Sequence, residues 1–108
     1  MQKILHKEND FILRFEKGED VIESLRYFCD QVGIKSGVIN AIGAVSELVL
    51  GFYDLENKKY IDTELKKNFE IASFSGNISL FENQTVIHAH GVFSDESGAC
   101  TGGHIKKM

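Results

Sequence analysis

Hydrophobic and polar residues alternate along most of the chain, which is the pattern of strands that bury one face of a sheet. Such segments are bounded by turn residues and contain no proline. They predict strands at residues 2–7, 11–16, 60–65, 69–81 and 85–93, with two more inside 34–53 that are broken at 43–46. The charges within 60–65 favour an edge position for that strand.

One segment has helical periodicity instead. Asp20 with Glu23 three residues later has the form of a capping box, and Gly33 suits a C-terminal cap. Between them the apolar positions follow helical spacing, at Val21, Leu25, Phe28, Cys29 and Val32. A helix over about 20–32 is therefore predicted, with this stripe packed on the sheet. At 108 residues the chain has room for one core, so residues 1–108 are expected to form a single domain.

Three of the four histidines, His88, His90 and His104, lie within seventeen residues of one another. Residues i and i+2 of a strand share a face, so His88 and His90 point the same way, roughly 6.6 Å apart at the backbone. Two imidazoles at that spacing can converge on one metal ion. The pair therefore marks a candidate metal site.

His104 can join this pair only if the intervening hairpin has the right parity. A three-residue loop over 96–98 would pair Asp95 with Ala99 and bring His104 opposite His90. A two-residue loop, or a bulge in the following strand, would turn its side chain to the other face. The sequence thus predicts a three-histidine site that depends on the loop type.

Three neutral imidazoles suit zinc best, although nickel, iron or copper would also fit. They leave a coordination position open. The main alternative to a non-catalytic site is therefore a metal-dependent enzyme of unidentified substrate, with a zinc-bound water and Glu70 as a base if it lies nearby.

The strand predicted at 69–81 alternates with unusual regularity. One face, expected to join the core, carries Ala72, Phe74, Gly76, Ile78 and Leu80. The other carries Ser73, Ser75, Asn77 and Ser79. If this strand neighbours 85–93, the polar row either borders the histidines and hydrogen-bonds to them, or simply meets water. On the neighbouring strand, Ile87, Ala89 and Phe93 are expected to face the core.

Composition narrows the functional classes. The net charge is −4, from 12 basic and 16 acidic residues, and no basic stripe is present, which disfavours direct binding of nucleic acid. No apolar run approaches the ~20 residues that span a bilayer, and the N-terminus lacks a signal-peptide core. Cys29 and Cys100 are expected to be free thiols, so a cytoplasmic location is predicted.

Several short motifs, in order and over nearly the whole chain, resemble the PPC (plant and prokaryote conserved) domain. They are Gly18-Glu-Asp-Val21, Gly33-Ile34, Ala41-Ile-Gly-Ala-Val-Ser46, Gly51-Phe-Tyr-Asp54, Phe69-Glu-Ile71, Ser75-Gly-Asn-Ile78, His88-Ala-His90 and Gly102-Gly-His104. The resemblance implies an α/β (α+β) fold, a largely antiparallel sheet flanked by a helix, assembled as a trimer. It also implies that His88, His90 and His104 form a metal-binding cluster.

Free-standing prokaryotic proteins that look like this one are described as candidate DNA-binding or regulatory proteins. In plants the domain accompanies AT-hook motifs and mediates self-association and contacts with other proteins, but this chain has no Arg-Gly-Arg-Pro hook. The family domain usually continues past its Gly-Gly-His motif, so a C-terminally shortened member or a truncated chain is expected here. The resemblance favours a zinc-binding homo-oligomer with a regulatory role.

Overall fold

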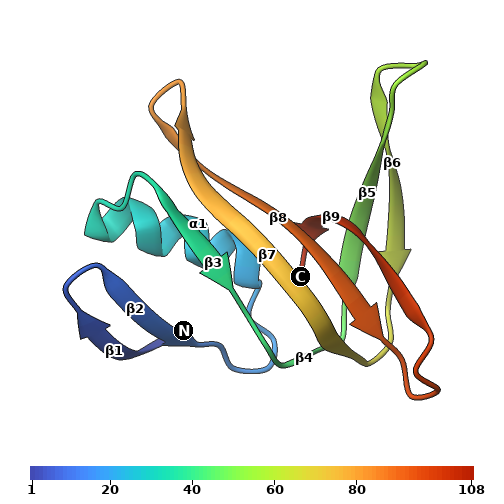
Figure 1. The fold of residues 1–108 in the computed structure, drawn as a ribbon, viewed down its shortest axis with the longest axis horizontal. Helices are drawn as coiled ribbons and strands as arrows, with labels where there is room; N and C mark the ends of the chain where they lie inside the picture. The colour runs from blue at the N-terminus through green and yellow to red at the C-terminus, as the bar shows by residue number, and fades with distance from the viewer.

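The computed structural model describes residues 1–108 as one helix and nine strands (Figure 1). These are β1 (Gln2–Lys7), β2 (Asp10–Arg14), α1 (Val21–Val32), β3 (Gly37–Asn40), β4 (Ala44–Val45), β5 (Leu48–Asp54), β6 (Lys59–Leu65), β7 (Phe69–Phe81), β8 (Gln84–Ser94) and β9 (Cys100–Lys107). β1 and β2 form a two-stranded sheet. The other strands form a seven-stranded sheet in the order β3–β7–β8–β9–β5–β6, with β4 paired to β7. Every pairing is antiparallel, which confirms the predicted α+β class.

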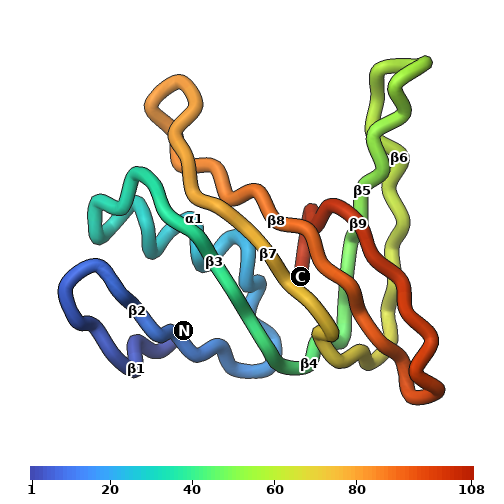
Figure 2. The backbone as a smooth tube through the Cα atoms, in the orientation of Figure 1, coloured from blue at the N-terminus to red at the C-terminus, as the bar shows by residue number.

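Strands β7 and β8 form one long antiparallel hairpin within the sheet, as the backbone tube shows (Figure 2). Its two-residue turn places Glu82 and Asn83 in left-handed conformation, with φ of 50° and 64°. This turn type matches the right-handed twist of the flanking strands, which pair from Phe81 and Gln84 onward. The predicted strands at 69–81 and 85–93 are confirmed.

A bulge interrupts the alternation of β7. The register shifts just after Ile71, and the extra residue is Ala72, which is exposed. Because one inserted residue reverses the parity of the strand, the core face runs through Phe69 and Ile71 before the bulge and resumes at Phe74 after it. The prediction that Ala72 belongs to the core was wrong for this reason. Leu80 is also 42% exposed, because the hairpin tip projects beyond the helix (Figure 1).

The segment 34–53 contains three strands rather than the two predicted. The expected break at 43–46 holds the short strand β4, in which Ala44 and Val45 pair with Glu70 and Phe69 at the start of β7. The predicted edge position of 60–65 is confirmed, since β6 is the last strand of the sheet.

Helix α1 has the predicted caps. The Asp20 carboxylate accepts a hydrogen bond from the Glu23 N–H at 3.1 Å, and Gly33 is left-handed with φ 82°. Its buried stripe, Leu25, Phe28 and Cys29, lies against the sheet. The helix has 12 residues, and no helix is long and apolar enough to cross a membrane.

The core lies between α1 and one face of the sheet. Its buried residues are Leu48, Leu50, Phe69, Phe74, Ala89, Phe93, Ile105 and Met108, with Ile39, Ile71 and others packed beside them. On β8, Ala89 and Phe93 are fully buried and Ile87 is half-buried, as predicted. No helix covers the opposite face of the sheet, so alternate residues of β8 are left free for another role.

Candidate metal centre

The uncovered face of the sheet brings the three predicted histidines together. His88 and His90 alternate with the buried residues of β8, and His104 on β9 pairs directly with His90. Directly opposed residues of an antiparallel pair point to the same face. All three imidazoles therefore share the outer face, as the sequence predicted.

The loop between β8 and β9 has the predicted three-residue form. The Asp95 N–H donates to the Ala99 carbonyl at 2.9 Å, the Gly98 N–H donates to the Asp95 carbonyl at 3.0 Å, and Gly98 is left-handed with φ 83°. The Asp95 carboxylate holds the loop by accepting from the Ser97 hydroxyl at 2.7 Å and from the Ala99 N–H at 3.1 Å. The hydroxyl and N–H of Ser97, with the Lys67 ammonium and the Ala99 N–H, lower the pKa of Asp95 to about 2.

The three imidazoles converge. Their ring centroids are 5.2 Å apart for His88 and His90, 5.2 Å for His88 and His104, and 5.5 Å for His90 and His104. One nitrogen from each ring lies within 4.8 Å of the other two, and the Nε2 atoms of His88 and His90 are 3.2 Å apart. Two nitrogens bound to one tetrahedral zinc are separated by about 3.3 Å. The cluster is thus close to a ligating arrangement.

His104 is the most enclosed member of the cluster. Its Nδ1 is buried and has no hydrogen-bond partner. Burial lowers the pKa of this imidazole, and the neighbouring His88, His90 and Lys106 lower it further, while Asp62 opposes them. The site therefore favours the neutral ring, which is the form that binds a metal ion.

A glycine makes room for His104 on its other side. Gly51 of β5 pairs with His104, and a Cβ there would lie 3.0 Å from Cδ1 of Tyr60 and 3.4 Å from Cδ2 of His104. With no side chain between them, the two rings approach to 5.2 Å between centroids. The Lys106 ammonium lies 4.9 Å over the Tyr60 ring and 2.8 Å from the Asp62 carboxylate.

Sequence reasoning missed this surrounding group. It identified residues 60–65 only as a charged edge strand and assigned Lys106 no role. The strand register in the structure explains their position. Gly51 pairs with both His104 and Asp62, which places β6 side chains on the histidine face. That pairing joins strands far apart in the chain, so local pattern could not reveal it.

The polar row of β7 lies beside the histidines but does not hydrogen-bond to them, so of the two alternatives the one in which it meets water is confirmed. Asn77 pairs with His88 and Ser75 pairs with His90. Their side chains make no hydrogen bond to the imidazoles, and both residues are exposed. They form a polar margin to the cluster that faces water.

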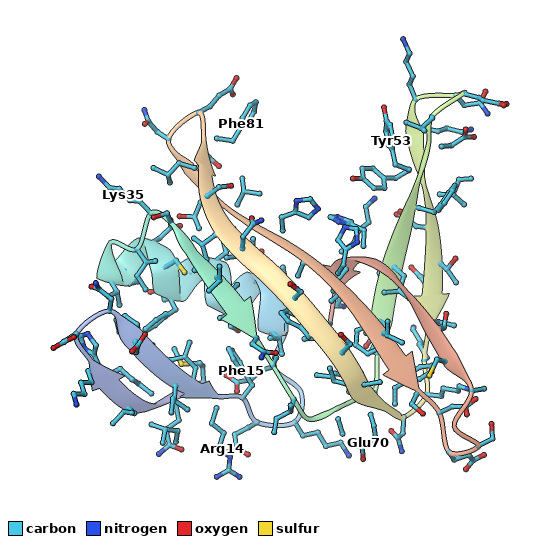
Figure 3. All side chains as sticks on the ribbon, viewed as in Figure 1. Arg14, Phe15, Lys35, Tyr53, Glu70 and Phe81 are labelled. Atoms are coloured by element: carbon cyan, nitrogen blue, oxygen red, sulfur yellow. The ribbon has the colours of Figure 1, made fainter.

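Glu70, the residue considered as a catalytic base, is not brought to the cluster. It pairs with Ser94, four residues from His90 along β8, or about 13 Å at strand spacing. Figure 3 shows Glu70 near the start of β7, whereas Tyr53 projects from β5 towards the β7–β8 hairpin. Glu70 therefore lies too far from the cluster to act as its base.

Comparison with known proteins gives one family and several similar structures. Residues 3–108 match the Plants and Prokaryotes Conserved (PCC) domain. A Bacteroides thetaiotaomicron protein named "putative dna binding protein" shares 30% identity and a TM-score of 0.93, over 98% of this chain and 73% of its own. No curated protein matches.

Two archaeal structures are also similar. A metal-containing protein from Archaeoglobus fulgidus shares 37% identity and a TM-score of 0.82, over 88% of this chain and 67% of its own. A plant- and prokaryote-conserved (PPC) protein from Pyrococcus horikoshii shares 33% identity and a TM-score of 0.85, over 88% of this chain and 66% of its own.

Replacing Gly102 by alanine should separate His104 from His90. A Cβ at this position would lie 2.5 Å from the Gly91 carbonyl oxygen, so the two strand backbones must move apart. We expect ¹⁵N-¹H NMR spectra of Gly102→Ala to show large shifts along β8 and β9. The matched control is Gly98→Asn, because nothing lies within 4 Å of its Cβ and asparagine tolerates the left-handed conformation. Unchanged β8 and β9 shifts in Gly102→Ala would contradict the close approach.

The lowered pKa of His104 predicts sensitivity to acid in the metal-free protein. The unfolded chain takes up a proton near pH 6.5, whereas the folded state resists it. The free energy of unfolding should therefore fall as pH decreases below about 6.5. His104→Gln, which cannot titrate, should show a smaller fall in urea titrations between about pH 6.5 and 5. Equal slopes for the two proteins would show that His104 titrates normally.

Proposed function

Because the chain belongs to the Plants and Prokaryotes Conserved (PCC) domain family, we propose that it acts as a zinc-binding homo-oligomer with a regulatory, partner-binding role. The observation that carries this proposal is the convergence of His88, His90 and His104 on one face of the sheet. Imidazole nitrogens within 4.8 Å of one another are a poor arrangement for purely structural side chains, because the rings offer one another few hydrogen bonds.

The residues present fit a borderline transition metal. The donors are three imidazoles without a carboxylate or thiolate, a set that suits zinc, while nickel, iron or copper would also accept it. The buried His104 Nδ1 has no hydrogen-bond partner in the protein, and buried polar atoms are normally paired. A bound ligand from outside the chain would supply the missing partner. When bound, zinc would supply a Lewis-acidic centre with a position open to a further ligand. The similar A. fulgidus protein is named as metal-containing.

Exposed apolar side chains support self-association. Only 14 of the 108 residues are buried, and the β5–β6 hairpin projects as an arm from the sheet (Figure 1). On that arm Phe52 is 70% exposed, its cross-strand partner Ile61 is 50% exposed, and Leu55 near the turn is 79% exposed. Apolar residues gathered in this way mark protein interfaces. A trimer is the assembly that the family resemblance implies.

A regulatory role through protein partners is preferred to direct contact with DNA. The similar B. thetaiotaomicron protein is named as a candidate for DNA binding. This chain carries a net charge of −4, however, and phosphate contacts need clustered Lys and Arg. If the protein associates with DNA, a basic partner protein in the cytoplasm would make the contacts with phosphate.

The metal site can be tested on tag-free protein by plasma mass spectrometry. We expect about one zinc ion per chain, because the three imidazoles supply the protein ligands for a single ion. His90→Ala should lose the metal, since two imidazoles remain. The matched control is His6→Ala on β1, where the ring stacks on Phe11 away from the cluster, and it should keep the metal. Metal retained in His90→Ala, or absent from the parent, would refute the site.

The oligomer can be tested by light scattering. We expect the parent to have about three times the chain mass of 12.1 kDa. Phe52→Lys combined with Leu55→Lys should give the monomer mass, because each change places a charge on the apolar arm. Tyr27→Lys, on the exposed side of α1, is the control and should leave the mass unchanged. A monomeric parent would contradict the proposed assembly.

A further inference from the structure

The histidine cluster has no net negative charge near it that would neutralise a bound divalent ion. All three donors are neutral in the ligating state, and no carboxylate joins the cluster. The nearest charged pair is Lys106 and Asp62, whose side chains are 2.8 Å apart and cancel each other. A metal ion would therefore be the dominant local charge, and its open position would favour an anionic ligand.

An aromatic pair lies beside the histidine cluster. Tyr53 of β5 and Tyr60 of β6 pair across the hairpin, with ring centroids 5.2 Å apart at 61°. Tyr60 contacts the His104 ring, while Tyr53 is 43% exposed and contacts no histidine. The two rings give the site an apolar, solvent-facing wall.

Strand register explains why Tyr53 and Tyr60 lie next to the histidine cluster. The pairing of β5 with β9 ends at Gly51 and His104, and beyond that point β5 and β6 continue as the projecting arm (Figure 1). Tyr53 is two residues beyond Gly51 and so shares its face. In Figure 3 Tyr53 projects from the arm towards the β7–β8 hairpin. Across the cluster, Val86 and Val92 of β8 are 37% and 39% exposed on the same face.

We propose that this face binds a small organic carboxylate with an aromatic body. The carboxylate would occupy the open position of the histidine-bound metal, and the ring would lie against Tyr53 and Tyr60. This inference rests on the metal site proposed above. It adds a ligand class and two residues, Tyr53 and Tyr60, that select it.

An organic carboxylate fits better than an inorganic phosphate. Phosphate sites supply several N–H donors from Arg, Lys or a helix N-terminus. Here Lys106 is the one cation near the cluster, and it is already paired with Asp62. Arg14 and Arg26 lie on β2 and α1, away from the cluster. An exposed aromatic pair adds nothing to phosphate binding, whereas it stabilises a ligand ring by stacking or edge contacts.

The test uses the full chain loaded with Co²⁺, whose visible absorption reports its ligands. Cobalt is added first, and the appearance of the bands measures metal binding alone. Benzoate, acetate and inorganic phosphate are then titrated separately in a non-coordinating buffer, and the band shifts give each affinity. We expect benzoate to bind about tenfold more tightly than acetate, from the aromatic contacts, and more tightly than phosphate.

Substitutions test whether the Tyr53–Tyr60 pair causes the preference for benzoate over acetate. Tyr53→Ala should retain the cobalt bands and acetate binding but lose most of the benzoate preference, because Tyr53 does not contact the histidines. Tyr27→Ala, on the exposed side of α1, is the matched control and should retain the preference. Equal affinity for benzoate and acetate in the parent, tighter binding of phosphate, or an unchanged preference in Tyr53→Ala would overturn the ligand class. Absence of the cobalt bands would overturn the metal site itself and this inference with it.

Discussion

The antiparallel register of β8 against β9 is the constraint on which the candidate site depends. A strand has only two faces, so a shift of one residue would turn His104 into the core and put Ile105 into water. The three-residue loop at 96–98 sets that register, and Asp95 holds it by accepting hydrogen bonds from three groups in and beside the loop, the N–H and hydroxyl of Ser97 and the N–H of Ala99. The residue that fixes the site is therefore a loop carboxylate about five residues from the nearest ligand.

The two faces of β8 and β9 have different roles. On the core face Ala89, Phe93 and Ile105 are nearly fully buried, and this packing fixes the backbones of β8 and β9. The outer face uses that rigidity to hold polar rings close together without a core of its own. A site built on strands rather than on loops keeps its geometry well, which suits ligands that must converge to within a few tenths of an ångström.

Glycines permit the close approaches that this arrangement needs. Gly102 brings the backbone of β9 against that of β8, and Gly51 lets the rings of Tyr60 and His104 meet. The sequence showed the first of these as a Gly-Gly-His motif, and the loop type gave the correct pairing of His90 with His104. The helix and the two strands of the long hairpin could also be predicted, because their caps and periodicity are local, whereas the pairing of these strands was left open. Two features could not. The bulge at Ala72 leaves no mark on the alternation of 69–81, and the meeting of β6 with the histidine face depends on pairings between distant strands.

In the proposed site, three imidazoles bind one metal ion and leave one coordination position open. X-ray absorption at the zinc edge of the purified protein tests it most directly, because the spectrum reports ligand type, number and distance together. We expect nitrogen or oxygen neighbours at about 2.0–2.1 Å, with the outer-shell scattering of about three imidazole rings. A sulfur neighbour at about 2.3 Å, or scattering from fewer than two imidazoles, would contradict it.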